Sequence, residues 1–219
     1  LRSLRALREI NKESGLILLL SGLGLGVFLL ASYLNGHLGF PLDDSWIHQT
    51  YARNLAEFGE FSFIPGQLSA GSTSPLWTGA LTIGYLLHLP YLTWTFLIGW
   101  LSLSLVALMG MILARRFSDN MRAGGLWIGV FLALEWHLIW ASASGMETLL
   151  YSGVILSVFV LLFSRRVPWF WAGLLIGASI WLRPDGLTLM GPLGWVIYFT
   201  IDEWRGRLRS LAVSLAGIL

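Results

Sequence analysis

Clusters of basic residues separated by apolar runs are the feature that most constrains this chain. Of its fourteen Lys and Arg residues, all but Arg53 and Arg183 fall in four short groups with hydrophobic stretches between them. The groups are Arg2/Arg5/Arg8/Lys12, Arg115/Arg116/Arg122, Arg165/Arg166 and Arg205/Arg207/Arg209. Short loops rich in Lys and Arg stay on the cytoplasmic side of a membrane. We therefore expect a multi-pass membrane protein with a cytoplasmic N-terminus and all four groups inside.

The composition agrees with a membrane protein. The chain is 56% hydrophobic and only 12% charged, whereas a soluble domain carries about 25% charged residues. The basic groups account for the net charge of +2, and no basic groove or stripe remains that would indicate a nucleic-acid partner. The absence of Cys excludes a disulfide framework, a thiolate metal site and a Cys nucleophile. We expect an all-α integral membrane protein, a polytopic helical bundle.

The apolar runs predict six membrane-spanning helices and the start of a seventh. A helix needs about 20 apolar residues to cross the bilayer core. The predicted spans are 15–34, 91–114, 123–141, 148–163, 169–182 and 187–201, with another starting at 211. The shorter run at 76–89 is interpreted as an interfacial helix, because a crossing there would place Arg115 and Arg116 outside. We interpret residues 1–219 as the N-terminal part of a longer transmembrane module.

Residues 35–90 then form a long first extracytoplasmic loop. Within it, apolar residues recur at spacings of three and four, which predicts a helix over 43–58 lying on the membrane face. These residues are Ile47, Tyr51, Leu55 and Phe58. We expect Asp43 or Asp44 to cap the start of this helix and Gly59 to end it. Residues 61–74 are expected to be irregular, ending in a turn rich in Gly, Ser and Thr.

The charged residues that the predicted topology places on the outer side of the membrane are the candidates for chemistry. They are Asp43, Asp44, Glu57, Glu60, Glu147, Asp185, Arg53 and Arg183. An outer-loop carboxylate can act as a general base, and Asp43 and Asp44 are the candidates for this catalytic role. Adjacent helical side chains point about 100° apart, so only one of the two is expected to face a reaction. The alternative is that they cap the helix.

Two outer arginines are candidates for binding a lipid-borne phosphate. Arg183 lies where two short spans turn, near the membrane face, and Arg matches phosphate with paired hydrogen bonds. It can instead snorkel to the interface or pair with Asp185. Arg53 can serve the same purpose, or form an exposed i,i+4 pair with Glu57.

For the other titratable residues, the sequence allows both a structural and a functional explanation. Glu147, at the outer end of a span, is explained by its favourable place at a helix N-terminus. His48 lies four residues after Asp44 on the same helical face, so the two can hold a divalent metal, although the sequence offers no third ligand. Glu135 and His137 lie inside the third predicted span, where ionisable residues are functional candidates, and a mutual or interhelical hydrogen bond explains them equally well.

Four short motifs in order resemble the GT-C glycosyltransferases, membrane enzymes that take a sugar from a polyprenyl-phosphate carrier. The motifs are Asp43-Asp44 with Tyr51-Ala52-Arg53-Asn54-Leu55, Gly71-Ser72-Thr73-Ser74-Pro75-Leu76-Trp77, Gly145-Met146-Glu147-Thr148 and Arg183-Pro184-Asp185-Gly186. They are most similar to the branch that contains mycobacterial cell-wall arabinofuranosyltransferases, and the chain also looks like the protein mannosyltransferases. The resemblance implies catalytic roles for Asp43 and Asp44. It also implies substrate-binding roles for Arg183, Glu147, Arg53, His48 and Asp185.

The leading hypothesis is therefore a membrane glycosyltransferase that transfers a sugar to an extracytoplasmic glycan, lipid or protein. One alternative is a non-catalytic subunit with the same fold in a larger membrane protein complex. Another is a transporter or lipid flippase, which needs polar residues along a path through the membrane and usually shows inverted repeats. Glu135 and His137 are the only clear residues for such a path.

Overall fold

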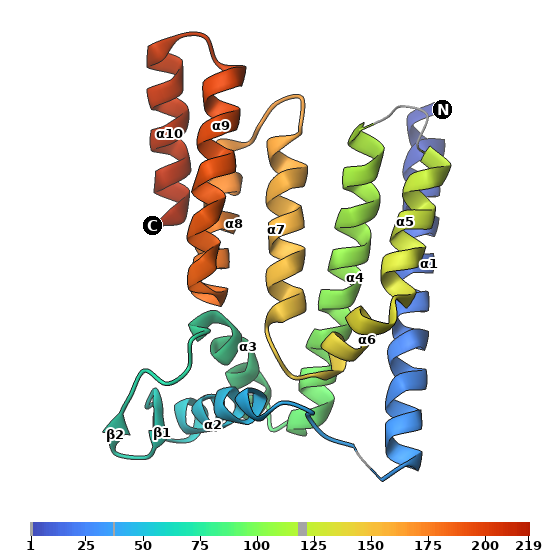
Figure 1. Cartoon of the computed structure of the whole chain (residues 1–219), viewed down its shortest axis with the longest axis vertical. Coiled ribbons are helices and arrows are strands. Elements are labelled where there is room, and N and C mark those ends of the chain that lie inside the picture. The colour runs from blue at the N-terminus through green and yellow to red at the C-terminus, as the bar shows by residue number, and fades with distance from the viewer. Residues whose placement is uncertain (1, 37, 118–121) are drawn as a thin grey trace.

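A computed structural model describes residues 2–36, 38–117 and 122–219, and these are mostly helical (Figure 1). The α-helices are α1 Arg2–Leu34, α2 Asp43–Phe58, α3 Pro75–Leu86, α4 Tyr91–Phe117, α5 Arg122–Leu134, α6 Trp136–Ala143, α7 Thr148–Leu162, α8 Trp169–Leu182, α9 Met190–Thr200 and α10 Trp204–Ile218. A 3₁₀-helix, η1, covers Pro184–Leu189, and two strands, β1 Ser62–Ile64 and β2 Gln67–Leu68, form a hairpin. The predicted all-α class is confirmed.

The long helices run side by side between two ends of a bundle (Figure 1). α2, α3 and the hairpin gather at one end, together with the turn between α6 and α7 and the 3₁₀-helix η1. The turn between α7 and α8, the turn between α9 and α10 and the end of α4 lie at the other end of the bundle, as does the start of α1. The basic pairs Arg115/Arg116 and Arg165/Arg166 and the group that starts at Arg205 therefore share one end of the bundle.

Two helices are each long and apolar enough to cross a membrane: Asn11–Leu34, within α1, and Tyr91–Phe117, which is α4. Gly124–Leu134 and Trp136–Ala143 meet the same criterion only together, as one span bent by 50°. α7 and α8 are apolar but shorter. These findings agree with an all-α membrane protein, and the number of six spans stays a prediction.

The segment of the predicted span 123–141 is not one continuous helix, because the chain bends at Glu135 between α5 and α6. Glu135 has an extended backbone, and its carboxylate accepts hydrogen bonds from the Leu138 backbone N–H at 2.8 Å and from His137 Nδ1 at 2.6 Å. The carboxylate therefore replaces a helical carbonyl as acceptor at the start of α6, which is what an N-cap does. The mutual hydrogen bond considered for Glu135 and His137 is confirmed, and the His137 side chain is 86% exposed.

The outer helices differ from prediction in their contacts. α2 spans 43–58 and ends at Gly59 in the left-handed conformation, as expected, but its N-cap is Leu42 and no side chain caps it. The expected membrane-facing stripe is also wrong at Tyr51, which is buried with its hydroxyl 2.6 Å from Ser69 Oγ. The interfacial helix expected over 76–89 is shorter, Pro75–Leu86.

Two elements differ from the prediction: the hairpin was not expected, and the last helix begins earlier than expected. Strands of three and two residues are too short to show an alternating pattern. The hairpin is attached to α2 through Asn54, whose side-chain N–H groups donate to the carbonyls of Ser62 and Phe63. α10 begins at Trp204 rather than at residue 211, so that Arg205, Arg207 and Arg209 lie within the helix.

A buried apolar cluster joins the outer helices to the bundle. It consists of Ala52, Trp77, Leu81, Val154 and Leu182, from α2, α3, α7 and α8. Because protein interiors are close-packed, such a cluster holds its elements in one relative position. The start of α7 and the end of α8 are thereby placed next to α2 and α3.

Candidate functional site

A pocket of ≈ 330 Å³ lies where α2, the segment before α3, the start of α7 and the end of α8 meet. It is lined by Asp44, Ile47, His48, Gly71, Thr73, Met146, Glu147, Arg183, Pro184 and Asp185. All four motifs of the sequence analysis contribute to this lining. The volume is at the lower end of the about 300–1,000 Å³ that small-molecule sites enclose. Segments more than a hundred residues apart thus form one polar pocket.

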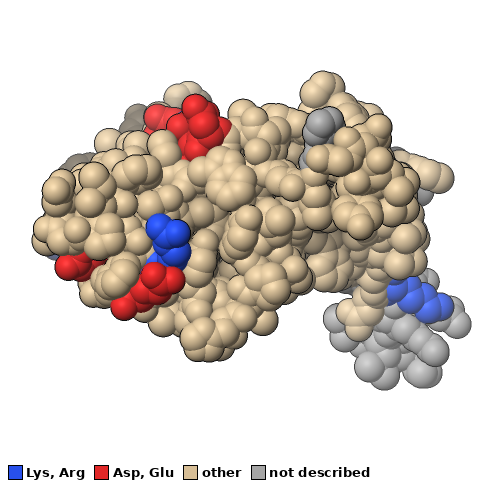
Figure 2. All heavy atoms as spheres, turned by 90° about the horizontal axis from the view of Figure 1, so that it is seen from below, with Lys and Arg blue, Asp and Glu red and all other residues tan. Residues whose placement is uncertain are grey.

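The surface around this end of the bundle is sparsely charged. In Figure 2, acidic side chains lie on it in separate groups, one of them directly beside a basic side chain. A larger hollow of ≈ 590 Å³ lies between α1 and the bent pair α5 and α6. Leu23, Val27, Phe28, Leu134 and Ile139 are in its lining, which includes no titratable side chain. The polar pocket, to which all four motifs contribute, is taken as the candidate site.

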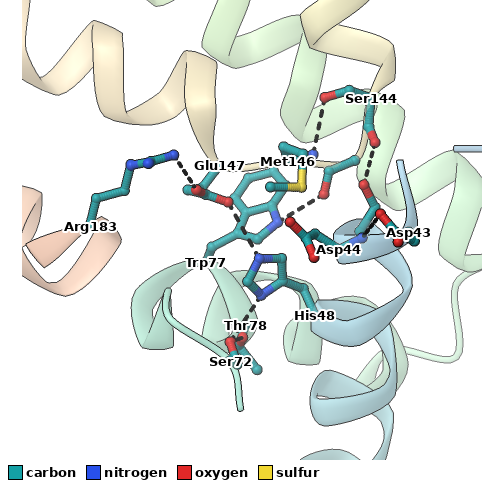
Figure 3. A network of polar contacts seen from close by, with 12 residues as sticks. Asp43, Asp44, His48, Ser72, Trp77, Thr78, Ser144, Met146, Glu147 and Arg183 are labelled. Carbon is teal, nitrogen blue, oxygen red and sulfur yellow. Dashed lines mark hydrogen bonds and ion pairs between the residues drawn. The ribbon is translucent and has the colours of Figure 1, made fainter. Parts of the chain in front are cut away.

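Glu147 is the central residue of the pocket (Figure 3). It is only 2% exposed, and its Oε1 atom accepts a hydrogen bond from Arg183 Nη1 at 3.1 Å. Its Oε2 atom lies 3.5 Å from His48 Nε2 and has no hydrogen-bond partner in the part of the chain that the structure describes. Buried polar atoms are nearly always hydrogen-bonded. Oε2 is therefore a buried acceptor that lacks a donor among the described residues.

The surroundings keep Glu147 ionised. Burial by itself raises the pKa of a carboxyl group, because it disfavours the charged form. The facing His48 ring, the backbone N–H of Glu147 and the charge of Arg183 act in the opposite direction and together outweigh burial, so the pKa of Glu147 lies below its ordinary value of 4.5. Glu147 is thus a carboxylate at neutral pH.

His48 connects the pocket to a row of buried hydroxyl groups. The ring is 3% exposed, and its Nδ1 atom is 2.9 Å from Ser72 Oγ, which is 2.8 Å from Thr78 Oγ1. Ser72 comes from the segment before α3 and Thr78 from α3 itself. The ring is therefore held at Nδ1 by a hydroxyl group, and its Nε2 atom faces the carboxylate of Glu147.

The turn that carries Glu147 is held by the outer helices. Ser45 Oγ donates to the Ser144 carbonyl at 2.6 Å, and Trp77 Nε1 donates to the Gly145 carbonyl at 3.1 Å. Gly145 has φ +79°, and a Cβ there would lie 2.7 Å from the Phe40 ring. Both the backbone conformation and the space require glycine.

The two adjacent aspartates are separated by the geometry of α2. Asp44 lines the pocket, whereas Asp43 is exposed and points away from His48 and Glu147 in Figure 3. Asp43 Oδ1 accepts a hydrogen bond from the Asp44 backbone N–H at 3.1 Å. The expectation that only one of the pair faces the pocket agrees with this arrangement.

Arg183 follows the last residue of α8 and borders the pocket. Its Nη1 atom bonds Glu147, and its Nε atom lies 3.6 Å from Asp185 Oδ2, so the pairing considered for Asp185 occurs. The side chain is still 40% exposed. A guanidinium has five N–H donors, so these two contacts leave donors for a ligand.

Other expected contributors lie elsewhere. Arg53 is exposed and does not line the pocket, and among the described residues it forms no ion pair with Glu57. No group of three or more His, Asp or Glu side chains in the described ranges could hold a metal ion. Asp44 and His48 therefore gain no third protein ligand.

Several contributors were not expected from the sequence. Ser45, Ser72, Trp77 and Thr78 position the loop of Glu147 and the ring of His48. The Gly-Ser-Thr-Ser motif is interpreted from sequence as a turn, and only its place in the ordered motifs indicates a role.

Comparison with protein-family models, with curated proteins and with solved structures gives no match. What the pocket does is therefore inferred from its own chemistry and from the order of its motifs.

Proposed function

We propose that the protein is a membrane glycosyltransferase that moves a sugar from a polyprenyl-phosphate donor to a hydroxyl group of an extracytoplasmic glycan, lipid or protein. One observation carries this proposal: Asp44, Glu147 and Arg183, from three of the four ordered motifs, line one pocket. A carboxylate base, a buried carboxylate that accepts hydrogen bonds and a guanidinium are the groups that such a transfer uses.

The distribution of basic residues supports an outward-facing pocket. The end of α4, which carries Arg115/Arg116, the turn that carries Arg165/Arg166, and the start of α10 lie at the end of the bundle opposite α2 and α3 (Figure 1). Basic loops remain in the cytoplasm. The pocket then faces the outside of the plasma (inner) membrane, where polyprenyl-phosphate sugars are used after they cross the bilayer.

In the proposed reaction Asp44 takes the proton of the acceptor hydroxyl as that oxygen bonds to the anomeric carbon of the sugar. The bond between this carbon and the phosphate oxygen breaks, and its electron pair leaves with the polyprenyl phosphate. Arg183 stabilises the negative charge that develops on the leaving phosphate through its N–H groups. Glu147 holds Arg183 in place from the buried side. The products are the glycosylated acceptor and polyprenyl phosphate.

The charges of the pocket fit a hydroxyl-rich ligand with a single phosphate. Arg183 is the one Lys or Arg among the described residues that line it. Three carboxylates face it, from Asp44, Glu147 and Asp185. Carboxylates accept hydrogen bonds from hydroxyl groups and repel anions. A sugar on one phosphate is therefore a better match than a polyanion such as a nucleotide.

Native mass spectrometry of the protein in mild detergent tests this proposal. Synthetic polyprenyl-phosphate hexoses and pentoses are offered together with ordinary phospholipids. We expect selective retention of a polyprenyl-phosphate sugar that weakens in Arg183→Ala. Arg53→Ala is the matched control, since it removes the other outer arginine without touching the pocket. Equal retention of phospholipid and polyprenyl-phosphate sugar by the wild-type protein contradicts the proposal and favours a transporter or a non-catalytic subunit.

A further inference from the structure

The buried pair formed by His48 and Glu147 has a more specific use. We propose that His48 Nε2 and Glu147 Oε2 together bind one hydroxyl group of a sugar, and that Ser72 and Thr78 determine which nitrogen of His48 carries the proton. That this sugar belongs to the donor or acceptor of a transfer reaction rests on the proposed function; the binding itself does not.

The His48 Nε2 and Glu147 Oε2 atoms are too far apart to form a good hydrogen bond with each other. His48 Nε2 and Glu147 Oε2 are 3.5 Å apart, beyond the 2.7–3.2 Å range of N–H···O hydrogen bonds. Oε2 has no other hydrogen-bond partner among the described residues, although the Glu147 side chain is only 3% exposed. A buried carboxylate oxygen without a partner is unfavourable unless a ligand or water supplies a donor. Both atoms belong to residues that line the pocket.

The hydroxyl row determines the tautomer of His48. With the proton on Nε2, Thr78 donates to Ser72, Ser72 donates to His48 Nδ1, and the Nε2–H donor faces the carboxylate acceptor across 3.5 Å. With the proton on Nδ1, the Nε2 lone pair would face Glu147 Oε2, and two acceptors would repel. The hydrogen-bond pattern therefore favours the Nε2–H form of the neutral ring.

A donor and an acceptor side by side fit a hydroxyl group. A hydroxyl oxygen accepts from Nε2–H and donates its own hydrogen to Oε2. A phosphate is repelled by Glu147, and an ammonium group cannot accept from Nε2–H. Arg183 holds the other oxygen of Glu147 at 3.1 Å, which fixes the orientation of the carboxylate. Sugar hydroxyls are therefore the ligand chemistry of this subsite, while Arg183 remains next to it for the phosphate.

The tautomer is tested by nitrogen-15 NMR of the detergent-solubilised protein labelled at histidine, at a pH at which His48 is neutral. His48→Gln identifies the signals of this ring. We expect Nε2 to carry the proton in the wild-type protein, and Ser72→Ala to give a mixture of tautomers. Thr82→Val is the control, since among the described residues Thr82 Oγ1 bonds only the Thr78 carbonyl of its own helix. A proton on Nδ1 in the wild-type protein overturns the role of the hydroxyl row.

Binding is tested with methyl pyranosides and methyl furanosides by saturation-transfer NMR in an amine-oxide detergent, which carries no sugar. We expect at least one glycoside to bind, one of its deoxy analogues to bind about tenfold more weakly, and this difference to disappear in Glu147→Gln. The same difference should persist in Thr82→Val. No loss for any deoxy analogue, or an unchanged loss in Glu147→Gln, overturns the proposal and leaves only a water between the two residues.

The two proposals fail separately. The methyl glycosides carry neither phosphate nor lipid, so their binding does not depend on a polyprenyl-phosphate donor. Glycoside binding without retention of polyprenyl-phosphate sugars would contradict the glycosyltransferase proposal and keep the subsite. If the protein retains the polyprenyl-phosphate sugar but no deoxy analogue binds more weakly in a way that depends on Glu147, the subsite is contradicted and the glycosyltransferase proposal is kept.

Discussion

Arg183 Nη1 lies 3.1 Å from Glu147 Oε1, and this ion pair joins the C-terminal end of α8 to the N-terminal end of α7. Each charge has the sign that its helix end favours, negative at an N-terminus and positive at a C-terminus. The carboxylate is buried, whereas the guanidinium remains 40% exposed. The pair therefore fixes Glu147 and keeps part of Arg183 available at the pocket.

The stability of the protein should depend on pH through Glu147. Its pKa is lowered in the folded state, so the stabilisation is complete above the ordinary value of 4.5 and is lost as the pH falls through the folded-state pKa. We predict that Glu147→Gln flattens this loss of thermal stability in acid. Thermal unfolding in detergent from neutral to acid pH measures it, with Asp202→Asn at an exposed position as control. The same acid dependence in wild type and Glu147→Gln would show that Glu147 is not its source.

Gly145→Ala should destabilise the turn that carries Glu147. A Cβ at φ +79° is strained and would lie 2.7 Å from the Phe40 ring, so we expect a loss of about 2 kcal/mol or more in the free energy of unfolding. Gly26→Ala is the matched control, because no atom lies within 4 Å of a Cβ there. In a helix that change should be neutral or stabilising by up to about 1 kcal/mol. Equal melting temperatures for the two variants would contradict the tight packing of this turn.

Trp77→Phe should weaken ligand binding through the same turn. The change keeps an aromatic ring in the buried cluster and removes the 3.1 Å hydrogen bond to the Gly145 carbonyl. We expect a cost of about 1 kcal/mol in stability together with weaker retention of the polyprenyl-phosphate sugar. Trp94→Phe removes an equivalent bond to the Ala80 carbonyl, and Trp94 does not line the pocket. It should lower stability similarly and leave retention unchanged.

The proposed orientation can be tested by single cysteines, because the chain has none. Leu68→Cys, on the exposed hairpin, should react with a membrane-impermeant maleimide in right-side-out vesicles. Asp202→Cys, in the turn before α10, should react only in inverted vesicles. Labelling of both from the same side would contradict the orientation that the basic clusters predict.

Much of the architecture followed from patterns along the chain. The positions of α1, α2, α4, α7 and α8 agree with the predicted apolar or amphipathic segments. The break at Glu135 could not be predicted, because hydropathy averages over a window in which one capping carboxylate has little weight. The hairpin was missed for a similar reason: its strands are short, and Asn54 holds it through side-chain bonds to the backbone.

The candidate site was only partly predictable. The spacing of Asp44 and His48 placed both on one face of α2, and the ordered motifs indicated Glu147 and Arg183. Which of these meet is decided by tertiary packing, as the exclusion of Arg53 from the pocket illustrates. The contacts from Ser72 and Thr78 to His48 likewise had no sequence signal, since Ser and Thr residues in such a segment are typical of turns.

A transfer assay with adjacent aspartate variants tests the central claim most directly. Wild-type protein, Asp44→Asn and Asp43→Asn are reconstituted in liposomes with the retained polyprenyl-phosphate sugar, and the release of polyprenyl phosphate with a panel of hydroxyl acceptors is measured. If Asp44 is the base, Asp44→Asn should lower the rate about 10²–10⁴-fold, while Asp43→Asn, which points away from the pocket (Figure 3), should retain it. Full activity in Asp44→Asn, or the same loss in both variants, would contradict the account.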